Sequence, residues 1–115
     1  MHIVHTRSDF TTLDQILNTA TGLAVTGFMF EVDSVDNAAL KPLTDALQNI
    51  VDSKAKLPFG SSGFNLNDLI SPVATTSEYT YYKGSLTTPT CNEVVEWINI
   101  LTPLKISSRQ LAMFR

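Results

Sequence analysis

The chain has 115 residues and a formal net charge of −3, from 8 basic and 11 acidic side chains. This charge argues against a nucleic-acid-binding module, because such proteins use an excess of Lys and Arg to neutralise phosphates. Hydrophobic residues make up 43% and charged residues 17% of the sequence, which is typical of a globular protein, and the length allows one domain. The longest apolar stretch, residues 22–30, is much shorter than the roughly 20 residues of a membrane-spanning helix.

The amino-terminal residues alternate in the manner of a β-strand. His2 and Val4 would face one side of this strand, and Ile3 and His5 the other. Residues 6–21 are polar and lack a sustained periodicity, so we expect a loop there.

A long apolar run follows at residues 23–32. It is rich in β-branched and aromatic side chains and has few polar positions, which predicts a central strand that is buried on both faces.

A helix is expected after Asp36 or Asn37, either of which can cap its amino end. Apolar residues then recur at three- and four-residue steps, and the predicted helix ends at Ser53. Prolines and glycines interrupt every pattern in residues 54–76, which predicts a surface segment with at most a short turn over residues 66–70.

Two further β-prone runs enclose a polar loop. We expect strands over residues 79–83 and 93–100, and a loop rich in Ser, Thr and Pro over residues 84–90.

The carboxy-terminal residues carry a helix signal. Ser107 and Gln110 have the spacing of a capping box, so we expect a short helix over residues 110–114. Taken together, the patterns predict a mainly β fold with peripheral helices, of the α+β class.

Residues that could bind a metal are few. A zinc site needs three or four ligands, but the chain has two histidines, His2 and His5, on opposite faces of the predicted strand, and one cysteine, Cys91. A metal site built wholly within these residues is therefore not expected, and a packed or hydrogen-bonded histidine is the simpler interpretation. An odd cysteine is either reduced or lacks its partner, and both interpretations stay open.

The Ser/Thr/Pro loop offers hydroxyl groups. Taken alone they favour turn chemistry, because Ser and Thr side chains readily bond to nearby backbone groups. No nucleophile elbow, phosphate-binding glycine loop or carboxylate pair accompanies them. These patterns alone predict a β-rich domain and no defined activity.

Five separated motifs occur in a fixed order along the chain. They are H-I-V-H at residues 2–5, G-L-A-V-x-G-F at 22–28, Y-x-G-S-L-T-T-P at 82–89, E-x-x-x-W at 93–97 and I-S-S-x-Q-L-x-x-F-R at 106–115. Together they resemble the carboxy-terminal half of an α-class (eukaryotic-type) carbonic anhydrase. The resemblance covers residues 1–115, which it identifies as a partial domain of that family, and it implies part of a twisted, mostly antiparallel central sheet.

The resemblance implies a zinc lyase that interconverts carbon dioxide and bicarbonate. His2 matches the third zinc-binding histidine of the family, whereas His5 matches a histidine that does not bind the metal. Thr87 matches the catalytic threonine that accepts a hydrogen bond from zinc-bound hydroxide, and its amide lies beside the substrate. Thr88 matches a position on the bicarbonate side. The apolar wall of the carbon dioxide site corresponds to Val4, Leu23, Val25, Leu86 and Trp97.

The chain also departs from the family pattern. Two of the three expected zinc ligands belong to the half that precedes Met1, so we expect a fragment that is inactive alone. The family has a proline at the position of Thr90, often after a cis bond. A cis bond before another residue type costs about 2.5 to 4 kcal/mol, so we expect a trans bond here.

Cys91 stands where secreted members carry a cysteine that pairs with one near their amino terminus. The resemblance therefore favours a secreted or extracellular parent protein with a disulfide to a cysteine absent from this chain, and a cytoplasmic location stays open. An alternative function is a truncated, catalytically silent binding module related to carbonic anhydrases. A third alternative, an unrelated β-rich domain, is disfavoured by the five ordered motifs.

Overall fold

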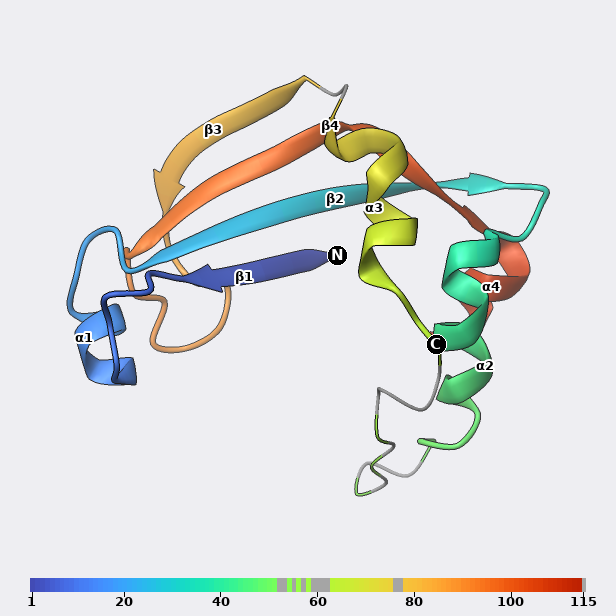
Figure 1. Ribbon diagram of the computed structural model, residues 1–115, viewed down its shortest axis with the longest axis horizontal. Coiled ribbons are helices and arrows are strands. Elements are labelled where there is room, and N and C mark those ends of the chain that lie inside the picture. The colour runs from blue at the N-terminus through green and yellow to red at the C-terminus, as the bar shows by residue number, and fades with distance from the viewer. Residues whose placement is uncertain (52–53, 55, 57, 59–62, 76–77, 115) are drawn as a thin grey trace. The chain divides into compact units, whose positions relative to one another are not determined.

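The computed structural model describes residues 1–51, 54, 56, 58, 63–75 and 78–114. Their elements follow one another as β1 (His2–Thr6), α1 (Leu13–Leu17), β2 (Leu23–Asp33), the 3-10 helix η1 (Ala38–Leu40), α2 (Lys41–Leu47), α3 (Leu66–Ala74), β3 (Tyr79–Gly84), β4 (Val95–Ser107) and α4 (Ser108–Ala112) (Figure 1).

The strands form one four-stranded sheet in the order β1-β2-β4-β3. The outer strands β1 and β3 each pair antiparallel with their inner neighbours, β2 and β4. Figure 1 shows β2 and β4 running side by side in the same direction, so the sheet is mixed. The predicted class, mainly β with peripheral helices, is confirmed.

Contacts divide the chain into two compact units. Unit 1 comprises Met1–Met29 and Ser77–Thr102, and unit 2 comprises Phe30–Thr76 and Pro103–Arg115.

The core of unit 1 lies where the sheet meets α1. Its buried side chains come from α1, β2 and the start of β4, and Phe10, Leu17 and Leu86 pack against them. The expected burial of both faces of β2 over residues 23–32 is only partly correct. Residues 23–28 are buried or half-buried, but Met29 is 60% and Val32 54% exposed and Glu31 is exposed, so the prediction is wrong at those positions.

Helix α1 corrects the expectation of a loop over residues 6–21. Thr12 and Gln15 form a capping box, in which the Thr12 hydroxyl accepts from the Gln15 amide N–H and the Gln15 side chain accepts from the Thr12 amide N–H. Local capping thus supports a five-residue helix that is too short to reveal a periodic apolar face.

In unit 2, Asn37 caps η1 through its side-chain oxygen, which accepts a hydrogen bond from the Ala39 amide. The following helix, α2, ends at Leu47. The prediction that this helix continues to Ser53 is therefore wrong at residues 48–51, and Ser53 lies outside the described residues. Val51 is 87% exposed, and an apolar residue without a packing partner gives a helix little support.

Two more predicted segments, a short turn and a carboxy-terminal helix, lie in unit 2. Helix α3 is longer than the predicted turn, because Asn65 caps it and its apolar residues Leu69 and Val73 are buried. The carboxy-terminal capping box of Ser107 and Gln110 is confirmed, but it begins α4 at Ser108 and the helix ends at Ala112, so the predicted range of 110–114 lies two residues too late. A capping box places its first residue just before the helix, so the helix starts directly after Ser107.

Candidate functional site

An open cavity of about 430 Å³ lies in unit 1, on the face of the sheet that carries His2. It brings together three of the residues predicted from the sequence, which are His2, Thr87 and Trp97. The remaining lining residues are Met29, Tyr82, Gly84, Ser85 and Asn99.

The position of His2 follows from the strand register. His2 pairs with Gly27 of β2, and because Gly27 has no side chain, residues of β4 can reach across it towards β1. The His2 and Trp97 rings meet edge to face, with centroids 4.9 Å apart and planes inclined by 71°. Trp97 is itself fixed, because its indole N–H donates to the Ser85 carbonyl at 3.1 Å.

The loop between β3 and β4 is held by its own hydrogen bonds. The Leu86 amide donates to the Asn92 carbonyl at 3.0 Å, and the Cys91 amide donates to the Thr88 carbonyl at 2.8 Å. The Asn92 side chain also donates to the Leu17 carbonyl at 3.4 Å, which joins the loop to α1. These bonds fix the backbone on either side of Thr87.

Thr87 is exposed at the cavity. Within the described part of the chain, its hydroxyl has no hydrogen-bond partner, so it can donate to and accept from a bound molecule. The peptide bond between Pro89 and Thr90 is cis, so the expectation of a trans bond is wrong. That expectation weighed only the intrinsic cost of the bond and not the hydrogen bonds that close the loop.

The predicted apolar wall lies mostly beneath the surface. Leu23, Val25 and Trp97 are buried in the core of unit 1, and Leu86 packs against them. Val4 is the register partner of Val25, but it is 57% exposed. Of the predicted substrate-binding residues, only Thr87 and Trp97 line the cavity; Thr88 is exposed and lies outside its lining.

Among the described residues that line this cavity, His2 offers the one imidazole that could bind a metal. No group of three or more His, Cys, Asp or Glu side chains that could hold a metal ion occurs among the described residues. His5 lies on the opposite face of β1, where its ring nitrogen Nε2 is 3.3 Å from the Thr26 hydroxyl. The residues present thus fit one ligand of a zinc centre and not a complete set.

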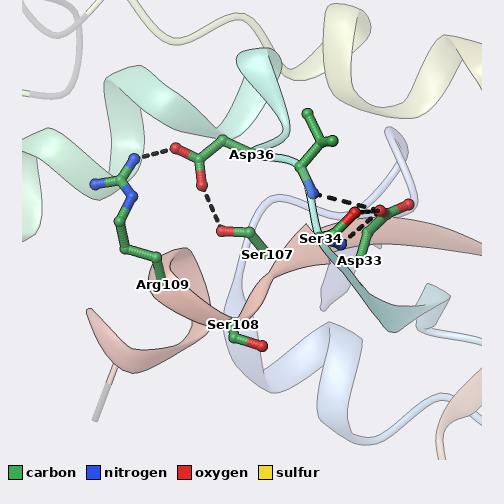
Figure 2. Close-up of a pocket in the computed structure, with 7 residues that line it drawn as sticks. Asp33, Ser34, Asp36, Ser107, Ser108 and Arg109 are labelled. Atoms are coloured by element: carbon green, nitrogen blue, oxygen red, sulfur yellow. Dashed lines mark hydrogen bonds and ion pairs between the residues drawn. The ribbon is translucent and has the colours of Figure 1, made fainter.

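A second cavity, of about 610 Å³, lies in unit 2 between the end of β2 and the start of α4 (Figure 2). Figure 2 shows the Asp36 carboxylate between the Arg109 guanidinium and the Ser107 hydroxyl. These two partners, Arg109 first, lower the pKa of Asp36 below its usual value. The amides of Val35 and Ser34 lower the pKa of Asp33 in the same way. Because both carboxylates already have partners, we assign these contacts a structural role.

Asn99 is a lining residue that the sequence analysis missed. It follows Trp97 by two positions on β4, so the alternation of side chains along a strand already places both on one face. That signal was present in the sequence, but the motif that contains Trp97 ends there and does not extend to residue 99.

Comparison with known proteins gives a consistent result. The sequence model described as "Eukaryotic-type carbonic anhydrase" matches residues 1–115. The chain is 35% identical to carbonic anhydrase 4 of Rattus norvegicus, over 99% of this chain and 36% of the relative. It is 35% identical to carbonic anhydrase 7 of Mus musculus, over 100% of this chain and 42% of the relative. It is 36% identical to carbonic anhydrase 12 of Homo sapiens, over 96% of this chain and 30% of the relative. The chain therefore spans less than half the length of these relatives.

None of the described helices is long and apolar enough to cross a membrane.

Proposed function

The chain belongs to the eukaryotic-type carbonic anhydrase family, and we propose that it is the carboxy-terminal half of a zinc-dependent domain that reversibly hydrates carbon dioxide to bicarbonate and a proton. One observation supports this most directly: His2, Thr87 and Trp97 come from three different segments and line a single cavity. These are the residues to which the motifs assign metal binding, orientation of the reaction and the apolar wall.

His2 is the one zinc ligand that we assign to this chain, and the other two belong to residues outside 1–115. A zinc ion held by three neutral ligands supplies hydroxide at neutral pH, because it lowers the pKa of bound water to about 7. The edge-to-face contact with Trp97 limits rotation of the His2 ring. That restraint reduces the entropy lost when the imidazole binds a metal.

Thr87 orients the reacting groups in this proposal. Its hydroxyl is free of partners in the described residues and stands at the same cavity as His2, on a loop that backbone hydrogen bonds hold on both sides. Thr88 follows it in the exposed part of the loop, where it would contact bicarbonate. Holding reactants in one geometry removes an entropic part of the barrier.

Carbon dioxide is small and uncharged, so an apolar surface suits it. Trp97 supplies such a surface at the cavity, and Leu23, Val25 and Leu86 support it from the core. Val4 stands beside Val25 on the same face of the sheet, and its exposed side chain would extend this surface along β1.

We further propose a secreted or extracellular protein in which Cys91 forms a disulfide with a cysteine outside this chain. The Cys91 thiol is exposed and unpaired among the described residues, so another cysteine can reach it. Mass spectrometry of the native protein under non-reducing conditions identifies the linked peptide, and an alkylatable Cys91 in that protein would contradict the pairing.

The proposal is tested by reading the transcript across the codon for Met1 and expressing the encoded protein. We expect the frame to continue upstream through two further zinc-binding histidines, and the expressed protein to hydrate carbon dioxide at a rate that a zinc chelator abolishes. The 115-residue chain alone should give no such rate. An in-frame stop directly upstream, with no hydration activity, would instead favour the catalytically silent binding module.

A further inference from the structure

Trp97 joins β4 to the loop that carries Thr87. Its indole N–H donates a hydrogen bond to the Ser85 carbonyl oxygen at 3.1 Å, and Ser85 lies two residues before Thr87 in the chain. The Trp97 side chain is 6% exposed and belongs to the core of unit 1, so packing holds the donor in place. A fixed core side chain therefore contacts the start of this loop at a defined point.

Gly84 allows the loop to approach the indole this closely. A Cβ atom at position 84 would lie 3.2 Å from Cδ1 and 3.4 Å from Nε1 of Trp97. Because glycine has no side chain, the backbone of residues 84 and 85 can lie against the edge of the ring. Tyr82 stacks on the same indole, with the ring centroids 6.2 Å apart. The indole is thus enclosed by the end of β3 and the start of the loop.

Two hydrogen bonds act on the residues directly before Thr87, and they differ in kind. The Leu86 amide donates to the Asn92 carbonyl at 3.0 Å, which closes the loop on itself. The Ser85 carbonyl instead accepts from Trp97, which joins the loop to the core of unit 1. Loss of the indole donor would leave a half-buried carbonyl without this partner, and such a loss costs free energy that the loop can recover by moving.

We propose that Trp97 is a positioning residue for Thr87, in addition to the apolar surface that it supplies. Its N–H holds the Ser85 carbonyl, and this bond keeps the Thr87 hydroxyl at the cavity that both residues line. Reactions depend steeply on such placement, because a displacement of about 1 Å can cost two orders of magnitude in rate. The effect on hydration rests on the proposed function, whereas the effect on the loop does not.

The test replaces Trp97 by benzothienylalanine, through a reassigned stop codon, in the protein at the length that its transcript encodes. The analogue keeps the shape and apolar area of tryptophan, but a sulfur atom stands where the indole has its N–H. In the metal-free protein we expect the methyl order parameter of ¹³C-labelled Thr87 to fall, as measured by NMR relaxation. Tryptophan inserted at the same codon should restore the wild-type value.

Thr26 provides the matched control for this measurement. Its hydroxyl lies 3.3 Å from the His5 ring, on the other side of the sheet from Trp97, so its order parameter should not change. An unchanged order parameter of Thr87 would overturn the proposal, provided that both proteins unfold at the same urea concentration. If the analogue prevents folding, Gly84→Ala gives a second route, because the new methyl group would press on the indole and should loosen Thr87 in the same way.

Hydration kinetics then measure how far the reaction depends on this bond. At wild-type zinc content, we expect the analogue to lower kcat by about tenfold and to leave KM unchanged. Because Trp97 acts through Thr87 in this proposal, the analogue should slow a Thr87→Ala protein no further. A full additional loss in that background would overturn the proposal. If the wild type hydrates no carbon dioxide, the proposed function fails, and the order parameter of Thr87 alone decides the role of Trp97.

Discussion

Gly27 and Trp97 both contribute to the surroundings of His2. The absent side chain at position 27 leaves room on β2 for the Asn99 side chain, and the Trp97 ring meets the His2 ring with centroids 4.9 Å apart. Tyr82 then stacks on Trp97 at 6.2 Å, so an aromatic layer extends from β3 towards β1. Aromatic contacts of this kind contribute about 0.5 to 1.5 kcal/mol beyond the area they bury.

We predict that Thr87→Ala in the expressed full-length protein slows carbon dioxide hydration by about 100-fold, since orientation of the reacting groups is lost. Its zinc content should equal that of the wild type. Stopped-flow hydration assays and metal analysis measure both quantities. Thr80→Ala is the matched control, because Thr80 is exposed on β3 and lies outside the cavity lining. Equal rates for Thr87→Ala and Thr80→Ala would remove Thr87 from the reaction.

Gly22 carries a steric prediction. A Cβ at this position would lie 2.0 Å from the Ile16 carbonyl oxygen, a backbone atom that cannot rotate away. Gly22→Ala should therefore lower the free energy of unfolding by about 1 to 3 kcal/mol, as measured by urea denaturation. Gly63→Ala has open space around it, and its left-handed backbone, with φ of 72°, should cost only about 1 kcal/mol. A smaller loss at Gly22 than at Gly63 would contradict this account.

At the scale of single residues, the sequence predicted some neighbours and missed others. The alternation of β1 was enough to place His2 and His5 on different faces, and the structure bears this out through their separate contacts with Trp97 and Thr26. Asn99 was missed because no motif marks it. Its proximity to His2 depends on the order of three strands, and residue spacing alone does not give that order.

At the scale of elements, capping residues indicated where helices begin better than the spacing of apolar residues indicated where they end. The Ser107 and Gln110 capping box indicated the existence of α4, although the helix begins two residues before the predicted range, and a similar pair, Thr12 and Gln15, begins α1 within a segment for which the lack of periodicity predicts a loop. Apolar spacing overextended the helix after Asn37, because spacing does not tell whether a partner surface exists. Tertiary packing therefore decides where a helix of weak propensity ends.

Asp36 gives a pH-dependent prediction at this scale. Its pKa is lowered below 3.8, first by Arg109 and then by Ser107. A lowered pKa in the folded state stabilises the protein above the unfolded pKa, and this stabilisation is lost as the pH falls through the lowered value. Arg109→Gln should therefore reduce stability at neutral pH, and the difference from wild type should shrink as the pH falls below 3.8.

The Asp36 carboxyl resonance provides the direct measurement. In an NMR titration of Arg109→Gln, the pKa of Asp36 should rise towards 3.8. Arg7→Gln is the control, because it removes the ion pair with Asp9 in unit 1 and should leave Asp36 unchanged. An Asp36 pKa that is the same with and without Arg109 would show that the ion pair does not form in solution.

At the scale of the whole chain, the sequence predicted the fold class and the family, and the comparisons confirm the family over residues 1–115. The five motifs carried that prediction because five separated motifs in a fixed order are far more specific than any one of them. The complete metal centre cannot be derived from this chain in the same way. Among the described residues that line the cavity of unit 1, His2 is the one side chain of a type that commonly binds zinc, and the chain spans 42% or less of the relatives named above.

The most direct test of the proposed zinc site is the metal content of two histidine variants of the full-length protein. His2→Ala removes the proposed ligand on the Trp97 side of β1, and His5→Ala removes the histidine on the other side. We predict that His2→Ala loses zinc and chelator-sensitive hydration, and that His5→Ala retains both at close to one zinc per chain. Full retention of zinc in His2→Ala, or its loss in His5→Ala alone, would contradict the assignment of His2 as the metal ligand.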